Sequence, residues 1–325
     1  MGNSKLSNPD ATDGRLPLTL LTGFLGAGKT TLLNRFLKSE GGQGTAVLVN
    51  EFGNVDVDGA VLGAALGTNQ LMNLPNGCVC CEVQDDLAEA LLDLTARRID
   101  EGIKRCVIET TGLADPGSIL RGVAHDPRLK GQVRVVQTIC VASAASIIDQ
   151  AETYVEAAEQ IALADRIVIS KADIAEANQT AGAKSDLTRR NPLAEISVAG
   201  PDKVDQVFAN PIRSIEVPRT HAHKHTHGIT TFSVELPGQM DRDKFRDILS
   251  FWIMRHAERL LRVKGILRFA QEPILQLMNV THDVCSIEPL ENTTEASPLV
   301  FIGIDLPESE IRADLTGCMI SPVKS

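Results

Sequence analysis

Residues 23–30 have the composition of a loop that binds phosphate groups. They read Gly-Phe-Leu-Gly-Ala-Gly-Lys-Thr, which fits the pattern G-x-x-x-x-G-K-S/T, after an apolar run and before a helical pattern. Glycines let backbone N–H groups converge on phosphate oxygens, and the start of a helix adds further donors. Lys29 is expected to contact the β- and γ-phosphates of a nucleotide, and the Thr30 hydroxyl to bind Mg²⁺. The residues expected to contact the nucleotide here are Gly23, Gly26, Ala27, Gly28, Lys29, Thr30 and Thr31.

An acidic residue at the end of a second apolar run supplies the expected partner of this loop. Val107 and Ile108 lead into Glu109, and Gly112 follows. A carboxylate at the carboxyl end of a strand would lie where a Mg²⁺-bound water sits, and a glycine lets a backbone N–H approach the γ-phosphate. Lys29, Thr30 and Glu109 are therefore predicted to carry nucleotide hydrolysis. The alternative is that Glu109 only ends a strand.

Residues 170–173, Ser-Lys-Ala-Asp, have the layout of the guanine-reading motif N-K-x-D, with serine in the first position. Asp173 would accept hydrogen bonds from the N1–H and 2-amino groups of guanine, which adenine lacks, and Lys171 would lie along the ring. A site built around such bonds rejects an analogue that cannot make them. Ser170, Lys171 and Asp173 are therefore predicted to select GTP. An ordinary turn between a strand and a helix is the alternative.

A cysteine-rich loop has the chemistry of a metal site. Cys78, Cys80 and Cys81 fall within four residues, directly after Gly77, and three thiolates can converge on one soft or borderline cation. A free thiol has a pKa of about 8.5, so metal binding must displace protons and weaken as the pH falls. The alternatives are three buried cysteines, or a redox or iron–sulfur role.

Four histidines alternate along a second candidate metal segment. His221, His223, His225 and His227 would lie on one side of an extended chain, where they could capture Zn²⁺, Ni²⁺ or Co²⁺. The same tract could equally be a solvated linker. His125, His256 and His282 are isolated in the sequence and are interpreted as surface or packing residues.

The elements that must position these residues alternate between strand and helix from Leu16 to about Val198. Near-continuous apolar strands separated by helices predict a mostly parallel sheet covered on both faces, the α/β architecture of a P-loop NTPase. The predicted strands are Pro17–Thr22, Ala46–Asn50, Cys106–Thr110, Val133–Val141, Ile167–Ser170 and Glu195–Val198, and the predicted helices are Lys29–Ser39, Asp85–Asp100 and Glu152–Ala164.

Four segments are predicted along the chain: a disordered N-terminus at 1–14, a P-loop GTPase domain at 15–210, a histidine-rich linker at 211–228 and a small C-terminal α+β domain at 229–325. In the last segment, strands are predicted at Thr230–Leu236, Leu260–Phe269, Ile274–Asn279 and Leu299–Ile304, and helices at Arg242–Glu258 and after Pro307.

The amino-acid composition and net charge disfavour some classes of function. The 325 residues are 43% hydrophobic and 23% charged, an ordinary balance for a soluble globular chain. A formal net charge of −10 disfavours a nucleic-acid partner, and no apolar run approaches the roughly 20 residues that span a bilayer, so no membrane partner is expected. The first apolar run leads straight into the glycine loop rather than an export signal, so a cytoplasmic protein is expected. The seven cysteines are odd in number and do not predict a disulfide framework.

Together these residues resemble the CobW-like GTPases, a branch of the SIMIBI-class P-loop proteins that serve metal homeostasis. The likeness runs from about Leu16 to Cys318. Ser170 is a departure, because asparagine is commonest at that position. The motifs that carry the resemblance are Gly23–Thr31, Asn50-Glu51-Phe52-Gly53 with Asp58 downstream, Gly77–Cys81, Glu109–Pro116, Ser170–Asp173, Asn191-Pro192-x-Ala194 and Arg262-Val-Lys264-Gly265.

The resemblance implies slow GTP hydrolysis, with Mg²⁺ at the phosphates, and delivery of a metal from the C-x-C-C loop to a client metalloprotein. It also implies that Glu51 and Asp58 belong to the first switch region, with Glu51 close enough to add a metal ligand. Three thiolates favour Zn²⁺ over hard cations but leave Co²⁺ open. A cobalt or iron insertion factor, for cobalamin synthesis or a hydratase-type enzyme, is therefore the second interpretation.

The sequence gives less support to two other classes of function, a small-molecule kinase and a metal store. A small-molecule kinase would need an acceptor-binding domain or a catalytic-base motif, and the sequence shows neither. A non-catalytic metal store would not need an intact phosphate loop. The sequence is compatible with a homodimer and does not identify the client.

The guanine-reading motif generates the first testable prediction. GTP should bind at least about tenfold more tightly than ATP, because unpairing a buried carboxylate costs more than about 1 kcal/mol. Asp173→Asn should remove most of this preference and admit xanthosine triphosphate. Competition binding with the three nucleotides measures both effects, and equal affinity of the wild-type chain for ATP and GTP would refute the guanine assignment.

Overall fold

A computed structural model gives the structure of residues 14–49, 71–73, 80–200, 203–209, 223–290 and 295–320. For residues 71–73, 80–84 and 223–224 it describes the backbone alone. Residues 1–13 of the predicted disordered segment, the Glu51–Asp58 region, Cys78 and His221 lie outside the described residues.

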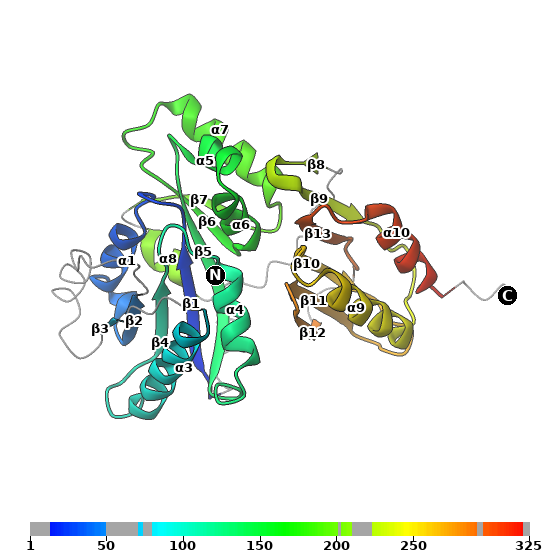
Figure 1. Cartoon of the computed structure of the whole chain (residues 1–325), viewed down its shortest axis with the longest axis horizontal. Coiled ribbons are helices and arrows are strands. Elements are labelled where there is room, and N and C mark those ends of the chain that lie inside the picture. Colours follow the sequence, from blue (N-terminus) through cyan, green and yellow to red (C-terminus); the bar gives the residue numbers. More distant parts are fainter. Residues whose placement is uncertain are drawn as a thin grey trace, which may run out of the picture.

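Seven strands form a parallel sheet in the order β3-β2-β4-β1-β5-β6-β7 (Figure 1). Their strand-to-strand pairings are all parallel, and most of their residues are buried, as expected for strands covered on both faces. The strands are β1 (Leu16–Thr22), β2 (Thr45–Val49), β3 (Leu71–Asn73), β4 (Arg105–Glu109), β5 (Val133–Ser143), β6 (Arg166–Ser170) and β7 (Glu195–Val198).

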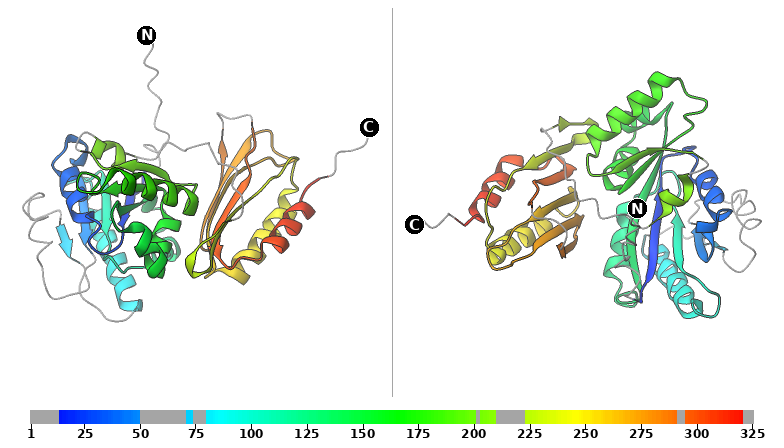
Figure 2. Two further views of the ribbon diagram at one scale, coloured as in Figure 1. Left: turned by 90° about the horizontal axis from the view of Figure 1, so that it is seen from above. Right: turned by 180° about the vertical axis from the view of Figure 1, so that it is seen from behind.

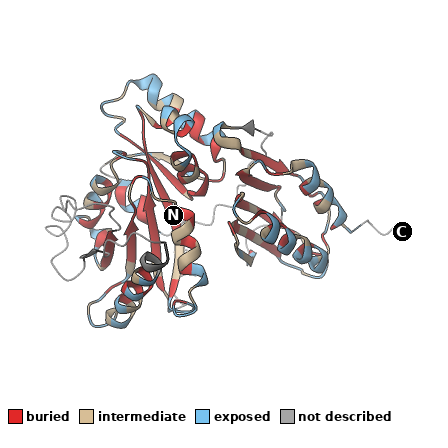
Figure 3. Ribbon diagram, in the orientation of Figure 1, coloured by how far each residue is buried: buried red, intermediate tan, exposed pale blue. Residues whose placement is uncertain are grey.

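Helices cover both faces of this sheet because successive side chains of a strand point to opposite sides. Leu20 of β1 packs in the core under α3 and α4, and its neighbour Leu21 packs in the core under α1 and α8. Figure 3 shows the buried residues, in red, running along the sheet between the two layers of helices. The helices are α1 (Lys29–Leu37), η2 (Glu40–Gly42), α3 (Cys80–Arg97), α4 (Pro116–His125), α5 (Ile147–Thr153), α6 (Val155–Leu163), α7 (Ala177–Arg190) and α8 (Val204–Phe208).

The C-terminal domain is an antiparallel sheet in the order β12-β11-β10-β13-β9-β8, with two helices on its outer face (Figure 2). Its core lies between the sheet and these helices, and includes Phe232, Phe245, Trp252 and Phe301. The elements are β8 (His223–Lys224), η4 (Thr226–Gly228), β9 (Ile229–Val234), α9 (Arg242–His256), β10 (Leu260–Leu267), β11 (Leu275–Thr281), β12 (Val284–Leu290), β13 (Leu299–Ile304) and α10 (Glu308–Gly317).

The predicted α/β fold with a small C-terminal α+β domain is confirmed, and the predicted strands recur with ends that differ by no more than two residues. One helix prediction was wrong: residues 152–164 do not form a single helix, because Tyr154 is extended (φ −119°, ψ 125°) and separates α5 from α6. The Tyr154 ring stacks on Phe24, with centroids 4.8 Å apart. Helices α4, α7 and α8 and strands β3 and β12 were not predicted. Within the predicted linker, residues 223–228 form β8 and η4, and β8 pairs with β9.

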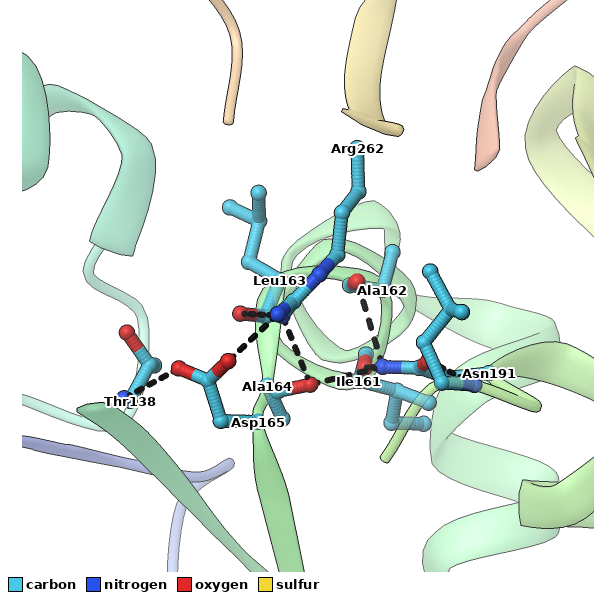
Figure 4. A network of polar contacts seen from close by, with 9 residues as sticks. Thr138, Ile161, Ala162, Leu163, Ala164, Asp165, Asn191 and Arg262 are labelled. Atoms are coloured by element: carbon cyan, nitrogen blue, oxygen red, sulfur yellow. Dashed lines mark hydrogen bonds and ion pairs between the residues drawn. The ribbon is translucent and has the colours of Figure 1, made fainter. Parts of the chain in front are cut away.

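The two domains meet at the C-terminal end of α6, which is buried and needs hydrogen-bond donors for its last carbonyl groups (Figure 4). Asn191 Nδ2 donates to the carbonyls of Ile161 (2.7 Å), Ala162 (3.2 Å) and Ala164 (2.9 Å). From β10, Arg262 Nη1 donates to the carbonyls of Leu163 (3.0 Å) and Ala164 (2.9 Å). One helix end is therefore held by both the nucleotide domain and the C-terminal domain.

An ion pair also links the two domains at this joint, by which we mean the contacts of Asn191 and Arg262 with the end of α6. Arg262 pairs with Asp165, which also accepts a hydrogen bond from the backbone N–H of Thr138 at 2.8 Å. Burial alone would raise the pKa of Asp165, but the Arg262 guanidinium outweighs it and holds that pKa below its ordinary value. The Arg262 side chain is 2% exposed, so removing Asp165 would leave a buried charge without its ion-pair partner.

The amide of Asn191 gives a stability prediction. Asn191→Ala removes a donor to three carbonyl groups, of which those of Ile161 and Ala164 keep a second donor, and should lower the free energy of unfolding by on the order of 2 kcal/mol, since the Ala162 carbonyl loses its side-chain donor and the other two are bonded less fully. Asn178→Ala, at an exposed position of α7, is the control and should change it by less than about 0.5 kcal/mol. Urea denaturation followed by circular dichroism measures both. Equal effects of the two substitutions would contradict this account of the joint.

Candidate nucleotide and metal site

The phosphate-binding loop connects the carboxyl end of β1 to α1. Gly23 follows the last residue of β1, and α1 begins at Lys29. Gly23 has a φ of 141°, and a Cβ at this position would collide with the backbone carbonyl of Val141 in β5. Glycine is therefore required where the loop crosses the top of the neighbouring strand, and the backbone N–H groups at the start of α1 point toward the loop.

The side chains predicted to carry hydrolysis lie together. Strands β1 and β4 are parallel neighbours with Leu21 opposite Glu109, so the loop after β1 and the end of β4 share one edge of the sheet. Thr30 Oγ1 donates to Glu109 Oε1 at 2.6 Å, and Lys29 Nζ donates to the carbonyl of Gly23 at 2.8 Å. Glu109 is 5% exposed. A hydroxyl and a carboxylate this close form an oxygen-donor set that fits a hard cation such as Mg²⁺.

Gly112 belongs to a segment that lies directly on the phosphate loop. The backbone N–H of Thr110 donates to the carbonyl of Leu21 at 3.0 Å, which continues the β1–β4 ladder past Glu109. A Cβ at Gly112 would come within 2.6 Å of the backbone nitrogen of Leu25. A larger residue here would push segment 110–114 away from the phosphate loop, and the role of Gly112 at the γ-phosphate stays a prediction.

The predicted base-reading segment, residues 170–173, is joined to the phosphate loop by the Ser170 side chain. This hydroxyl, 8% exposed, donates to the carbonyl of Ala27 at 2.6 Å and lies 3.3 Å from the carbonyl of Ala142. Lys171 follows with a φ of 56°, and Asp173 is exposed on the turn before α7. The serine thus fixes the base-reading turn relative to the phosphate loop, while Lys171 and Asp173 remain accessible to a base.

The strand register shows where the candidate metal loop leaves the sheet. Val49 of β2 is opposite Glu109 on one side and opposite Asn73 of β3 on the other. Neighbouring strands are about 4.8 Å apart, so residues 49 and 73 end within roughly 10 Å of the Glu109 backbone. Cys80 and Cys81 form the start of α3, and Glu51 and Cys78 follow these strand ends outside the described residues. No contact of the three cysteines with one another is described.

The described part of the histidine tract does not continue as an extended chain. His223 lies in β8, but His227 has a φ of 61° inside η4. Burial lowers the pKa of His225 to about 4, and the cations of Arg190 and Arg189 act in the same direction. Within the described ranges, no three His, Cys, Asp or Glu side chains lie close enough together to hold a metal ion. A metal site at this tract remains a prediction.

Two residues of the site were not predicted from the sequence. Gln160, fully buried in α6, donates through Nε2 to the carbonyls of Gly112 and Ala114, both at 3.1 Å. Two adjacent polar residues, Glu159 and Gln160, inside the otherwise apolar helical run 157–163 were the available signal. Burial raises the pKa of the Glu159 carboxyl to about 7, assisted by the negative charges of Asp115 and Glu156.

Comparisons with known proteins agree with this geometry. Residues 17–198 match the family model "CobW/HypB/UreG, nucleotide-binding domain", and residues 229–319 match "Cobalamin synthesis protein cobW C-terminal domain". The chain is 34% identical to the zinc chaperone YjiA of Escherichia coli strain K12, over 93% of this chain and 98% of that protein. It is 28% identical to the zinc chaperone CobW of a Sinorhizobium species, over 94% of this chain and 98% of that protein.

A solved structure is similar over the same extent. The Zn(II)-bound YjiA GTPase from E. coli superposes with a TM-score of 0.69 at 26% identity, and the match covers 94% of this chain and 99% of that one. None of the described helices has the length and apolar character needed to cross a membrane.

The environment of Glu159 predicts a pH dependence of stability. Because the folded-state pKa of about 7 lies above the ordinary value of 4.5, the folded chain holds this proton more tightly than the unfolded chain. The contribution to stability is complete below about pH 4.5 and is lost as the pH rises through 7. Glu159→Gln should therefore match the wild-type melting temperature near pH 4.5 and exceed it at pH 8. Thermal melts across this range measure the difference, and parallel curves would contradict the assignment.

Proposed function

This chain belongs to the CobW family, in which a CobW/HypB/UreG nucleotide-binding domain precedes a CobW C-terminal domain, and on that premise we propose that it is a GTP-hydrolysing zinc chaperone. It binds GTP at the loop after β1, binds Zn²⁺ at the C-x-C-C loop, and transfers the metal to a client protein. The observation that carries the proposal is the meeting of Lys29, Thr30 and Glu109 at the sheet edge from which the metal loop departs.

Hydrolysis in this site rests on charge and position. The Lys29 ammonium lies inside the loop, where it offsets the negative charge that develops on the phosphate oxygens in the transition state. Mg²⁺, when bound, supplies further charge neutralisation, and Thr30 and Glu109 are the residues that would hold it. Segment 110–114 presents the backbone of Gly112 beside the phosphate loop. These residues orient and neutralise the phosphates, which is the main requirement of phosphoryl transfer to water.

Zinc is the cargo rather than a resident cofactor. Cys78, Cys80 and Cys81 supply three soft ligands, which favour Zn²⁺, with Co²⁺ as the alternative metal, and leave a coordination position for a client residue. Glu51 comes two residues after the end of β2 in the sequence and is the proposed additional ligand. The described cysteines, Cys106, Cys140, Cys285 and Cys318, are free thiols, which suits a reducing compartment such as the cytoplasm.

Relatives support the same pairing of activities. The names of the E. coli and Sinorhizobium proteins describe zinc chaperones, and the solved E. coli protein is named a GTPase with bound Zn(II). The present chain carries its candidate nucleotide and metal residues in one nucleotide domain, so the two activities are proposed to share the edge of a single sheet.

The two halves of this function should be separable by mutation. Cys80→Ser with Cys81→Ser should weaken the tightest zinc site by at least on the order of 100-fold, since even losing a group that only orients a metal ligand costs about 10- to 100-fold. That variant should keep GTP turnover. Lys29→Ala should do the reverse, abolishing turnover while leaving zinc affinity in nucleotide-free protein unchanged.

Competition with graded chelators measures zinc affinity, and phosphate release measures turnover. Cys285→Ser, which changes an exposed free thiol in β12, is the matched control and should alter neither quantity. The same titration with Co²⁺ tests the alternative metal. Zinc affinity that survives loss of both thiols would contradict the assignment of the metal to the C-x-C-C loop.

A further inference from the structure

Gln160 is a fully buried polar residue of α6, and no contact within that helix accounts for it. Helix α6 is otherwise apolar along its buried length, yet Gln160 is fully buried among its alanines and leucines. Its Nε2 donates to the carbonyls of Gly112 and Ala114 at 3.1 Å each, and because both partners are acceptors, the nitrogen side of the amide must face them. Burying an amide is favourable only where such partners exist. The glutamine thus holds segment 110–114 in place.

The segment that Gln160 holds is the one that lies on the phosphate loop. Gly112 touches Leu25 so closely that a Cβ would be 2.6 Å from the Leu25 nitrogen. Segment 110–114 is therefore sandwiched between the phosphate loop and α6. A shift of this segment toward a γ-phosphate would change the two hydrogen bonds to Gln160 directly.

The opposite face of α6 belongs to the interface with the C-terminal domain. Ala158 and Ala162, each two positions from Gln160, pack in a cluster with Leu261, Val300 and Ile302. Residues two apart on a helix point to different sides, so α6 contacts segment 110–114 with one side and the C-terminal sheet with the other. At its end, Arg262 of β10 donates to the last carbonyls of the helix, as Figure 4 shows.

A second contact reaches the far end of the same segment. Segment 110–114 leads through Asp115 into α4, and Asp115 caps that helix by accepting from the backbone N–H groups of Gly117 and Ser118. His282, in the turn between β11 and β12 and 4% exposed, lies against Gly117, where a Cβ would collide with its ring. The C-terminal domain therefore touches the start of α4 directly and the segment itself through α6.

We propose that Gln160 is a positioning residue for the γ-phosphate-sensing segment 110–114, and that α6 couples the position of this segment to the docking of the C-terminal domain. The inference rests on the proposed GTPase function and extends it to regulation. GTP orders such segments through the γ-phosphate, and hydrolysis releases them. Through Gln160, that change reaches α6, the helix whose last carbonyl groups accept from Arg262. Reciprocity then requires that a partner which fixes the C-terminal domain in one position also changes the preference of the nucleotide site for GTP over GDP.

The test is an isosteric substitution. Gln160→Met keeps the buried volume and removes both donors. It should weaken binding of a non-hydrolysable GTP analogue about tenfold and leave GDP affinity unchanged, because GDP lacks the phosphate that segment 110–114 contacts. Gln137→Met is the matched control: Gln137 is also buried, in the N-terminal half of β5, and donates to the carbonyl of Ala209 at 3.2 Å, away from the loop. It should leave the ratio of the two affinities unchanged.

A second variant tests the coupling through α6. Arg262→Lys keeps a positive charge beside Asp165 but cannot bridge the two helix carbonyls as the guanidinium does. It should also lower the ratio of GTP-analogue to GDP affinity, and its effect should not add to that of Gln160→Met in a double-mutant cycle. In the wild-type chain, exchanging GDP for the GTP analogue should change amide hydrogen exchange in α6 and β10, a readout that needs no variant to fold.

The outcomes separate this inference from the proposed function. Equal losses of GDP and GTP-analogue affinity in Gln160→Met, or additive effects with Arg262→Lys, would show a merely structural glutamine and overturn the inference. Unchanged exchange in α6 and β10 would overturn it as well. A wild-type chain that neither hydrolysed GTP nor distinguished the two nucleotides would refute the proposed function instead.

Discussion

The parallel pairing of β1 with β4 is the constraint on which the functional geometry depends. It runs in register from Leu18 opposite Cys106 to Leu21 opposite Glu109, so the phosphate loop and the acidic residue reach the same sheet edge without any long excursion of the chain. The 2.6 Å contact between Thr30 and Glu109 follows from that register. Strands β2 and β3 extend it outward, which brings the start of the metal loop to the same edge.

A second constraint comes from the end of α6. Its last carbonyl groups are buried, so they must be paired, and the donors come from Asn191 and from Arg262. Arg262 belongs to the C-terminal sheet, so pairing these carbonyls also docks that domain. The helix that carries this joint also carries Gln160, which holds the segment beside the phosphate loop. Packing and hydrogen bonding thus connect the C-terminal domain, through α6, to the segment beside the phosphate loop.

Sequence patterns predicted the strands and the phosphate loop because both depend on local signals: apolar runs and glycines at fixed spacing. They did not predict the break at Tyr154, whose ring stacks on Phe24 of the distant phosphate loop. Helix α7 was missed because its sequence is mostly polar, and only Ala183, Asp186, Leu187 and Arg190 are buried. Arg262 was identified as part of a motif, but its role as a cap on another domain's helix needs tertiary structure. The sequence identifies the three cysteines of the loop as candidate metal ligands. Cys78 and the side chains of Cys80 and Cys81 lie outside the part of the chain that the structure describes.

We propose that bound nucleotide and bound metal change one another's affinity, because the phosphate loop and the strands that lead toward the cysteine loop end at the same edge of the sheet. The most direct measurement is the zinc affinity of the chain in its nucleotide-free, GDP-bound and GTP-analogue-bound forms, by chelator competition at one pH. The account predicts that the GTP analogue tightens zinc binding relative to GDP by roughly 5- to 150-fold, a coupling of about 1–3 kcal/mol. It also predicts that Zn²⁺ tightens the analogue by the same factor. Three equal zinc affinities would contradict it and leave two independent sites on one fold.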